Sequence, residues 1–448
     1  MQVTYCRGAE LKRRSRNPRT HSKKQIRQLA DSILTFGWTN PILIDADSRI
    51  VAGHGRLEAA KLLGIERVPT IRLDHLSEEQ IRAYVIADNR LAEIADWDRE
   101  LLALELGELA TLNLDFELTV VGFDTPELDI LIGDGVGEAP DEADEVPVPD
   151  PDAPVISRLG DLWQIGGHRL LCGDATDPAG YKRLLGDRPA QIVIVDPPYN
   201  VPIAGHVSGL GCAKHQNFAM ASGELTSSEF ITFLQTALAL HAAHSQDGAI
   251  HYVFMDWRHI GDLLTAGDTA YSELKNICVW AKTNAGMGSL YRSAHELIAV
   301  FKVGTGRHIN NIELGRHGRN RTNVWTYAGY NTFGPGRDEA LAAHPTVKPI
   351  ALIADAIKDC SHRGGVILDG FAGFGTTLLA AERTGRIGCG IELDPRYVDA
   401  TIRRLAQHAD LEAVHAGTGQ TFAEVEAARA TESVPAEIDA ATSSDEEA

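Results

Sequence analysis

The stretch IVIVDPPYN, residues 192–200, joins a run of apolar β-branched residues directly to an acid, two prolines and a tyrosine. Such a run predicts a strand that is buried on both faces, as in a parallel sheet. Asp196 ends the run, and Pro197 and Pro198 stiffen the chain before Tyr199. The sequence therefore predicts a carboxylate and an aromatic ring held rigidly at the carboxyl end of a central strand.

A second strand-and-turn pattern, GGVILDGFAGFGTTLLAAERTGRIGCGIELDP, spans residues 364–395. Its first strand ends in Asp369 and leads into a glycine-rich turn that contains Gly373 and Gly375. A helix follows, and the next strand ends in Glu392, whose carboxylate could accept both hydroxyls of a ribose. Thr-Thr stands in place of the third glycine of the dinucleotide pattern. Taken alone, this unit could therefore also be a plain strand-to-helix turn without a ligand.

Together these motifs resemble the DNA methyltransferases that methylate amino groups with S-adenosylmethionine as donor. The segments LCGDAT (171–176) and HPTVKP (344–349) are similar to two further motifs of that family. The motif order resembles its circularly permuted β group, mostly adenine-N6 methylases. The resemblance implies an α/β fold with a Rossmann-like, doubly wound methyltransferase sheet. The donor-binding residues that it implies are Asp174, Lys348, Asp369, Phe371, Gly373, Gly375, Thr376 and Glu392.

The chemistry of an exocyclic amine gives the opening segment a role. Such an amine is a poor nucleophile because its lone pair is delocalised into the base. Asp196 can accept one N–H bond and the carbonyl of Pro197 another, which frees the lone pair, while Pro198 helps to fix that carbonyl. Tyr199 would stack on a base flipped out of double-stranded DNA. We therefore expect Asp196, Pro197, Pro198 and Tyr199 to form the catalytic segment.

The amino-terminal part has a signature of its own. Residues from Asn17 to Leu73 resemble the smaller α+β ParB-like fold. In ParB proteins, the segment that matches Gly53-His-Gly-Arg56 contacts nucleotide phosphates, and a helix amino end suits anions. The resemblance thus implies a nucleotide at Gly53, Gly55 and Arg56, with a purely structural turn as the alternative. The chain is identified as a member of the ParB-type DNA modification methylases.

Charge is distributed unevenly along this chain of net charge −20. Residues 134–152 carry eight acids and no base, and residues 432–448 carry six acids and no base, which predicts an extended linker and a disordered tail. Residues 1–30 hold nine bases against one acid. Because local patches decide contact with phosphates, we expect DNA-binding residues in a basic region from about 276 to 343, and the candidates are Arg292, Arg316, Arg319 and Arg321.

These observations divide the sequence into four parts. They are a ParB-like domain with a helical extension (1–132), an acidic Pro/Gly linker (133–154), a methyltransferase domain (155–410) with a target recognition region (about 276–343), and a largely disordered acidic tail (411–448).

Composition predicts the surroundings of the protein. The six cysteines are scattered without a CxxC pair, and the sequence contains neither an apolar run of membrane-span length nor a signal-peptide core. We therefore expect a cytoplasmic protein with no metal site and no membrane partner. A homodimer and an accompanying restriction enzyme are left open. So are cytosine-N4 methylation and a non-catalytic ParB-like DNA-binding regulator.

Overall fold

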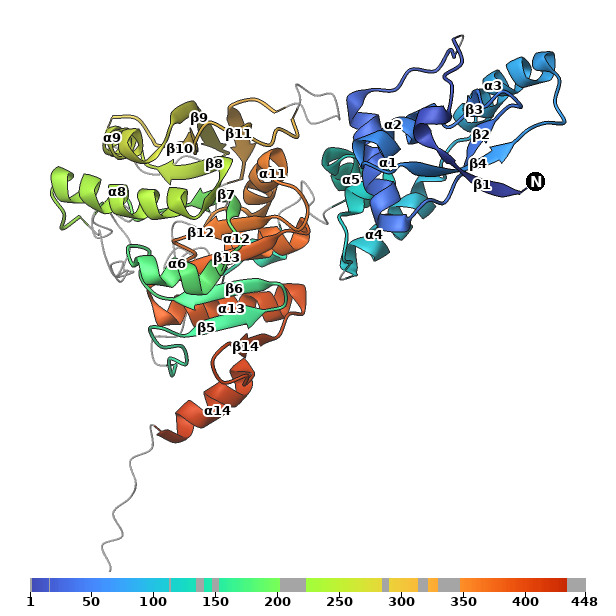
Figure 1. Cartoon of the computed structure of the whole chain (residues 1–448). Helices are drawn as coiled ribbons and strands as arrows, with labels where there is room; N and C mark the ends of the chain where they lie inside the picture. Colours follow the sequence, from blue (N-terminus) through green and yellow to red (C-terminus); the bar gives the residue numbers. More distant parts are fainter. Residues whose placement is uncertain are drawn as a thin grey trace, which may run out of the picture. The chain divides into compact units, whose positions relative to one another are not determined.

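The chain forms two compact units in the computed structural model, Met1–Gly133 and Asp134–Ala448 (Figure 1). The structure describes residues 2–15, 17–112, 114–133, 141–146, 153–201, 223–283, 290–312, 321–328 and 347–432. Within these ranges, no helix is both long enough and apolar enough to cross a membrane.

A four-stranded sheet with the order β1-β4-β2-β3 forms the centre of the amino-terminal unit. Its strands are β1 (Val3–Arg7), β2 (Ile42–Ile44), β3 (Ile50–Ala52) and β4 (Arg67–Arg72). The helices of this unit are α1 (Lys23–Phe36), α2 (His54–Leu62), α3 (Glu78–Glu93), α4 (Arg99–Thr111) and α5 (Thr125–Ile132). Ile42, Ile44 and Leu57 pack between the sheet and α2 in a small buried core. The α+β fold predicted for this unit is confirmed.

A ten-stranded sheet with the order β11-β9-β10-β8-β7-β12-β13-β6-β5-β14 organises the larger unit. Its strands are β5 (Leu162–Ile165), β6 (His168–Cys172), β7 (Ala190–Val195), β8 (Ser245–Met255), β9 (Glu273–Lys282), β10 (His295–Lys302), β11 (Val324–Tyr327), β12 (Val366–Asp369), β13 (Ile387–Glu392) and β14 (Ala413–His415). The five central strands β8, β7, β12, β13 and β6 are parallel. The predicted circularly permuted, doubly wound sheet is therefore confirmed.

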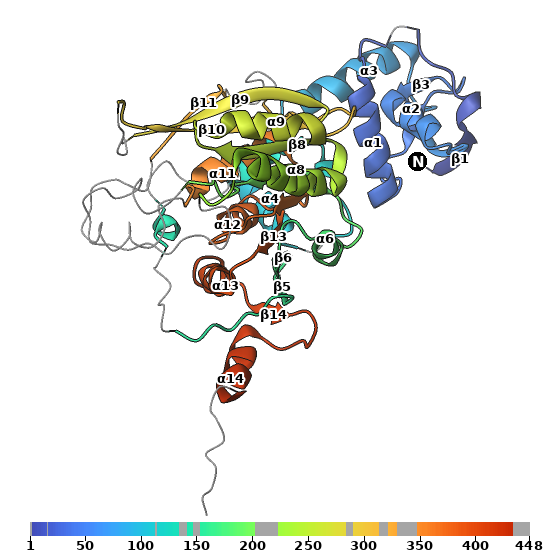
Figure 2. The ribbon, with the colours of Figure 1, turned by 90° about the vertical axis from the view of Figure 1, so that its left-hand side faces the viewer.

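Strand β7 is buried on both faces, as its sequence predicts. Ile192 and Ile194 join one core cluster, whereas Val193 and Val195 join the other, because successive side chains of a strand point to opposite faces. Both faces of the sheet carry helices (Figures 1 and 2). One face packs α6 (Pro178–Leu185), α8 (Ser227–Ala243) and α9 (Ile260–Ala270), and the other packs α11 (Ile350–Cys360), α12 (Thr376–Arg383) and α13 (Pro395–Ala409).

The sheet continues past residue 410, where the sequence predicts a disordered tail. Strand β14 pairs antiparallel with β5, and helix α14 (Phe422–Glu432) follows it. Val425 is buried, and Arg429 donates a hydrogen bond to Asp161. A few well-placed apolar and basic residues are enough to fix this segment on an existing sheet edge, although the composition of the tail as a whole is typical of disorder. Residues 433–448 lie outside the described residues.

The predicted target recognition region is, in its described part, the outer end of the sheet. Strands β9, β10 and β11 lie in it, and Cys278, Trp280, Ile298 and Trp325 are buried in the core. Residues 284–289, 313–320 and 329–343 of that region lie outside the described residues.

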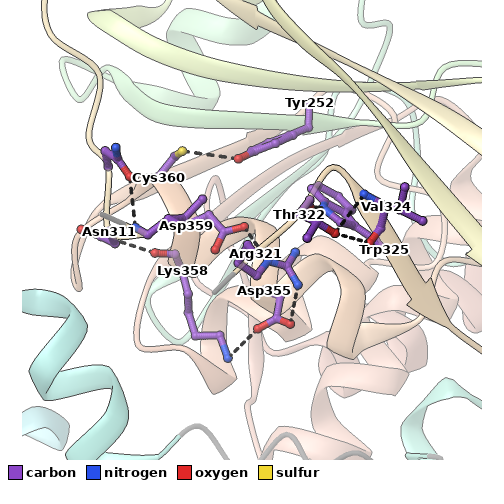
Figure 3. Close-up of polar contacts among 12 residues, drawn as sticks. Tyr252, Asn311, Arg321, Thr322, Val324, Trp325, Asp355, Lys358, Asp359 and Cys360 are labelled. Carbon is purple, nitrogen blue, oxygen red and sulfur yellow. Dashed lines mark hydrogen bonds and ion pairs between the residues drawn. The ribbon is translucent and has the colours of Figure 1, made fainter. Parts of the chain in front are cut away.

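Arg321, one of the predicted DNA-binding residues, makes internal ion pairs instead (Figure 3). Its Nε donates to Asp359 Oδ2 at 3.0 Å, and its Nη1 donates to Asp355 Oδ2 at 3.0 Å. The Asp359 side chain is only 2% exposed. Asp355 and Asp359 both lie on α11, so Arg321 ties the chain before β11 to that helix.

Replacing Arg321 by Ala should lower the free energy of unfolding by about 3 kcal/mol, because the buried carboxylate of Asp359 loses the ion pair with the guanidinium group. Urea denaturation of the full chain measures this loss. The matched control is Arg307→Ala, which removes an exposed arginine and should change stability by less than about 0.5 kcal/mol. Equal effects of the two substitutions would show that Arg321 has no structural role.

Candidate active site

Four acids lie at the carboxyl ends of four neighbouring parallel strands. Asp369 and Glu392 end β12 and β13, while Asp196 and Asp174 follow β7 and β6 within two residues. The strands are adjacent in the order β7-β12-β13-β6, so their carboxyl ends meet at one edge of the sheet. Burial raises the pKa of Asp369 to about 7, and the nearby charge of Asp196 adds to this rise.

Gly373 and Gly375 shape the turn between β12 and α12. Both lie in the left-handed region, with φ of +51° and +72°. A Cβ at Gly375 would lie 2.3 Å from Thr401 Cγ2, so the approach of α13 leaves no room for a side chain there. A Cβ at Gly373 would instead meet no atom of the described residues within 4 Å. The backbone of the turn therefore packs tightly against α13 at Gly375, whereas at Gly373 the described residues leave space beside it.

Three of the predicted donor-binding side chains contact the protein itself. Asp369 accepts hydrogen bonds from Thr377 Oγ1 at 2.6 Å and from the backbone nitrogen of Phe371 at 3.0 Å. Thr376 Oγ1 accepts a bond from Arg404, and the Phe371 ring packs against two rings of α8. These residues therefore fix the shape of the turn from the protein side.

Glu392 lies between the glycine-rich turn and Asp174. Its two carboxylate oxygens accept hydrogen bonds from the backbone nitrogens of Gly373 at 2.8 Å and Asp394 at 2.9 Å. Burial raises the pKa of Glu392 to about 7. The Asp174 carboxylate accepts bonds from the backbone and hydroxyl groups of Thr176.

This edge of the sheet fits S-adenosylmethionine, the donor that the sequence implies. Each oxygen of Glu392 has a second lone pair that can accept a ribose hydroxyl. The backbone is open at Gly373, where a nucleoside could approach it. The two acids with raised pKa values, Asp369 and Glu392, would gain from the positive charge of a sulfonium group.

The carboxylate of Asp196 is oriented by two side chains. Tyr199 donates its hydroxyl to Oδ1 at 2.6 Å, and Lys348 Nζ donates to Oδ2 at 2.5 Å. Burial raises the pKa of Asp196, although the charge of Lys348 acts in the opposite direction. Lys348, which the sequence assigns to the donor, thus lies against Asp196, the predicted catalytic acid.

Asn200 completes the turn after β7, and sequence reasoning missed it. Its φ is +53°, a conformation that Asn tolerates better than most residues. Its side chain donates to the carbonyl of Leu225 at 2.8 Å and accepts from the backbone nitrogen of the same residue at 3.2 Å. Pro197 and Pro198 therefore sit in a turn that is held at both ends.

Glu296 on β10 is a second residue that sequence reasoning missed. Its Oε2 lies 3.0 Å from the Tyr199 hydroxyl oxygen, whose single proton is shared with Asp196, and its carboxylate pairs with Lys282 at 2.6 Å and with Lys348 at 3.1 Å. Burial alone would raise its pKa, but the two lysine charges outweigh burial and lower the pKa to about 2. A single acid inside the apolar strand HELIAVFK was the available signal.

The glycine turn of the amino-terminal unit opens helix α2. Gly53 precedes the helix with a φ of +98°, and a Cβ at Gly55 would come within 2.9 Å of a side chain of α1. Arg56 Nη1 donates to the carbonyl of Pro41 at 3.0 Å. His54 Nε2 is buried and has no hydrogen-bond partner among the described residues.

Of the other three predicted DNA-binding residues, the structure describes one. Arg292 is exposed just before β10. Arg316 and Arg319 lie outside the described residues.

Three family models match successive parts of the chain. The ParB N-terminal domain matches residues 2–89, and the ParB-methyltransferase HTH domain matches residues 100–159. The DNA methylase model of the N6/N4 type matches residues 190–403. The second match covers α4 from its second residue, the whole of α5 and the whole of the predicted linker.

Individual proteins show similarity to the same parts. The ParB-like nuclease domain-containing protein YnaK of Escherichia coli K12 is 48% identical over 80 residues, which are 18% of this chain and 92% of that protein. The type II methyltransferase M.HpaI of Haemophilus parainfluenzae is 24% identical over 252 residues, 53% of this chain and 74% of that protein. The solved M1.HpyAVI-SAM complex shares 16% identity over 53% of this chain and 98% of that chain, with a TM-score of 0.38.

The chain therefore belongs to the S-adenosylmethionine-dependent DNA methylases of the N6/N4 family that carry a ParB-like amino-terminal domain.

Proposed function

We propose that this DNA methylase transfers its methyl group to the exocyclic N6 amine of adenine in double-stranded DNA. The observation that carries the proposal is the carboxylate of Asp196, which follows β7 next to the glycine-rich turn that follows β12. An amine bound at Asp196 would face a donor bound at the neighbouring strand end. The sequence DPPY at this position resembles the adenine enzymes of the family more than the cytosine enzymes.

The residues after β7 would activate the amine by positioning it. S-adenosylmethionine would supply a sulfonium methyl group, and in-line attack on it would break the methyl–sulfur bond and leave a neutral thioether. Asp196 and the carbonyl of Pro197 accept the two N–H bonds, which draws the nitrogen toward a tetrahedral shape and frees its lone pair. Because burial raises the pKa of Asp196, its carboxylate is also a suitable acceptor for the proton that the amine loses.

The target base must leave the duplex to reach Asp196. Flipping costs a few kcal/mol of lost pairing and stacking. Stacking of the base on the ring of Tyr199 would offset about 1–3 kcal/mol of that cost. The exposed Arg292 is a candidate for phosphate contact beside the flipped nucleotide.

Two other functions use the same residues differently. Cytosine-N4 methylation needs the same acceptors, because that amine is also delocalised into its ring. A non-catalytic DNA-binding regulator would have no use for a partly buried acid oriented by Tyr199 and Lys348. The orientation of Asp196 therefore favours an active enzyme over a regulator.

The amino-terminal unit is a candidate nucleotide-binding module. The backbone N–H groups at the start of α2 attract anions, and Gly53 allows close approach. Buried His54 Nε2, which has no partner among the described residues, could donate to a phosphate oxygen. We propose that this unit binds a nucleoside triphosphate through its phosphates.

The product identifies the target base. After incubation with DNA and the methyl donor, mass spectrometry of digested nucleosides should detect N6-methyladenine. The Asp196→Asn chain should give no product while its donor affinity changes by less than about fivefold, or ~1 kcal/mol. N4-methylcytosine would support the cytosine alternative, and a wild-type chain without either product would support the regulator. A collapse of donor affinity in Asp196→Asn would contradict the role given to Asp196.

Donor affinity should rise with pH through Glu392. Its pKa of about 7 exceeds the ordinary value of 4.5. Without donor, Glu392 therefore stabilises the folded state fully below pH 4.5, and this stabilisation is lost as the pH rises through about 7. A bound cationic donor favours the ionised form, so affinity should increase about tenfold between pH 6 and pH 8 with release of a proton.

Calorimetry at the two pH values, in buffers of different ionisation enthalpy, measures affinity and proton release together. Glu392→Gln should reduce this pH dependence to the part that Asp369 carries, and Glu392→Ala should weaken donor binding by about 1–3 kcal/mol. Unchanged affinity in both variants would remove Glu392 from the donor site.

Nucleotide binding can be tested by titrating the full chain with nucleoside triphosphates. His54→Ala should weaken binding by about fivefold or more, because a phosphate oxygen loses a donor. His75→Ala, a control in the same unit but outside the turn, should bind as the wild type does. If no triphosphate binds the wild-type chain, the glycine turn is structural.

A further inference from the structure

Residues 141–146, here called the acidic segment, connect the two units but are packed as part of the larger one. The sequence predicts this stretch to be an extended linker with little to bury. In the structure it forms a short 3-10 turn, and Ala143 and Val146 are 0% and 7% exposed. Ala143 belongs to the same core cluster as Ile192 and Ile367. The acidic segment is therefore folded onto the methyltransferase core.

Arg404 links the acidic segment to the glycine-rich turn. Its Nε and Nη2 both donate to the carbonyl of Ala143, at 3.1 and 2.8 Å. Its Nη1 donates to the carbonyl of Phe374 and to Thr376 Oγ1, each at 2.9 Å. Arg404 is 5% exposed. One buried guanidinium group thus bridges the acidic segment and the turn that would bind the donor.

Asp144 makes the corresponding link to the chain beside the catalytic acid. Its Oδ1 accepts a hydrogen bond at 2.8 Å from the backbone nitrogen of Ile350, the first residue of α11. Ile350 is two residues after Lys348, whose Nζ orients Asp196. Asp144 therefore anchors the backbone that carries Lys348.

A third contact fixes the far end of the helix that follows the turn. Asp141 forms an ion pair with Arg383, the last residue of α12. The two other acids of the segment, Glu142 and Glu145, are exposed. The acids thus divide into two that contact the methyltransferase core and two that face solvent.

We propose that the acidic segment is a positioning element of the methyltransferase site, which holds the glycine-rich turn and the Lys348 backbone in register. The proposal rests on the donor site described above. A backbone hydrogen bond or a bridging guanidinium can hold two elements only if both partners are present, so loss of one partner should loosen both elements. The methyltransferase unit then begins at residue 141 and not after residue 154.

Asp144 offers a matched set of variants in the full chain. Asp144→Ala removes the acceptor for Ile350, and calorimetry should show about tenfold weaker binding of S-adenosylmethionine. Asp144→Asn keeps an oxygen at the same place and should restore affinity to within about twofold of the wild type. Glu142→Ala removes an exposed acid of the same turn and should bind the donor normally.

Arg404 provides an independent test. Arg404→Lys keeps the charge but cannot reach both carbonyls, and it should weaken donor binding by about tenfold. Arg403→Lys is the control, because Arg403 is a half-exposed neighbour that pairs with Glu426. If Asp144→Ala does not fold, the Arg404→Lys result alone decides the proposal.

Thermal unfolding without donor separates positioning from simple anchoring. Variants that unfold at lower temperature but bind the donor with unchanged affinity would overturn the proposal, since the segment would then only hold the chain in place. If Glu392→Ala also leaves affinity unchanged, the donor site itself is misplaced. If Glu392→Ala weakens binding while Asp144→Ala and Arg404→Lys do not, only the role of the acidic segment is wrong.

Discussion

Asp196 and Glu296 share the ammonium group of Lys348, and this shared charge constrains the elements around the site. A carboxylate withdrawn from water is costly unless an opposite charge offsets it. Lys348 is 5% exposed, so water can hardly solvate its ammonium group if either acid moves away. The end of β7, the strand β10 and the chain before α11 must therefore meet at one point for the charge of Lys348 to be fully compensated.

The proposed donor-binding part of the site has the opposite electrostatic arrangement. Glu392 receives backbone N–H groups rather than a side-chain cation, and burial leaves its pKa near 7. Burial likewise raises the pKa of Asp369 to about 7. The part of the site proposed to bind the amine thus contains the positive charge of Lys348, whereas the proposed donor-binding part contains two acids whose ionised forms a cation would stabilise. This division suits a reaction between a neutral amine and a cationic methyl donor.

The sequence was most informative where local chemistry decides the structure. A strand run that ends in an acid places that acid at the carboxyl edge of a sheet, and so Asp196, Asp369 and Glu392 could be predicted. Glu296 could not be, because its partners Lys282 and Lys348 come from separate elements. The sequence marks Glu296 only as a charged residue within an apolar strand.

Composition misled where a few specific contacts outweigh the average of a segment. The acidic stretch that contains Ala143 looks like a linker, since nothing local reveals that Arg404 will bind its backbone. Arg321 likewise looks like a basic surface residue until α11 brings Asp355 and Asp359 beside it. Contacts of this kind depend on tertiary structure, which neither periodicity nor charge counting can reveal.

The strand order has a consequence for folding of the chain during its synthesis on the ribosome. Strand β7 is synthesised well before its parallel neighbour β12, in which Ile367 pairs with Ile192. The separation along the chain is larger still for β6 and β13, where Arg169 pairs with Cys389. Until those late strands emerge, the nascent chain presents unpaired, largely apolar strand edges, which are a known hazard for aggregation. Asp196, the acid predicted to be catalytic, is therefore synthesised well before β12 and β13, the strands whose carboxyl ends complete the proposed site.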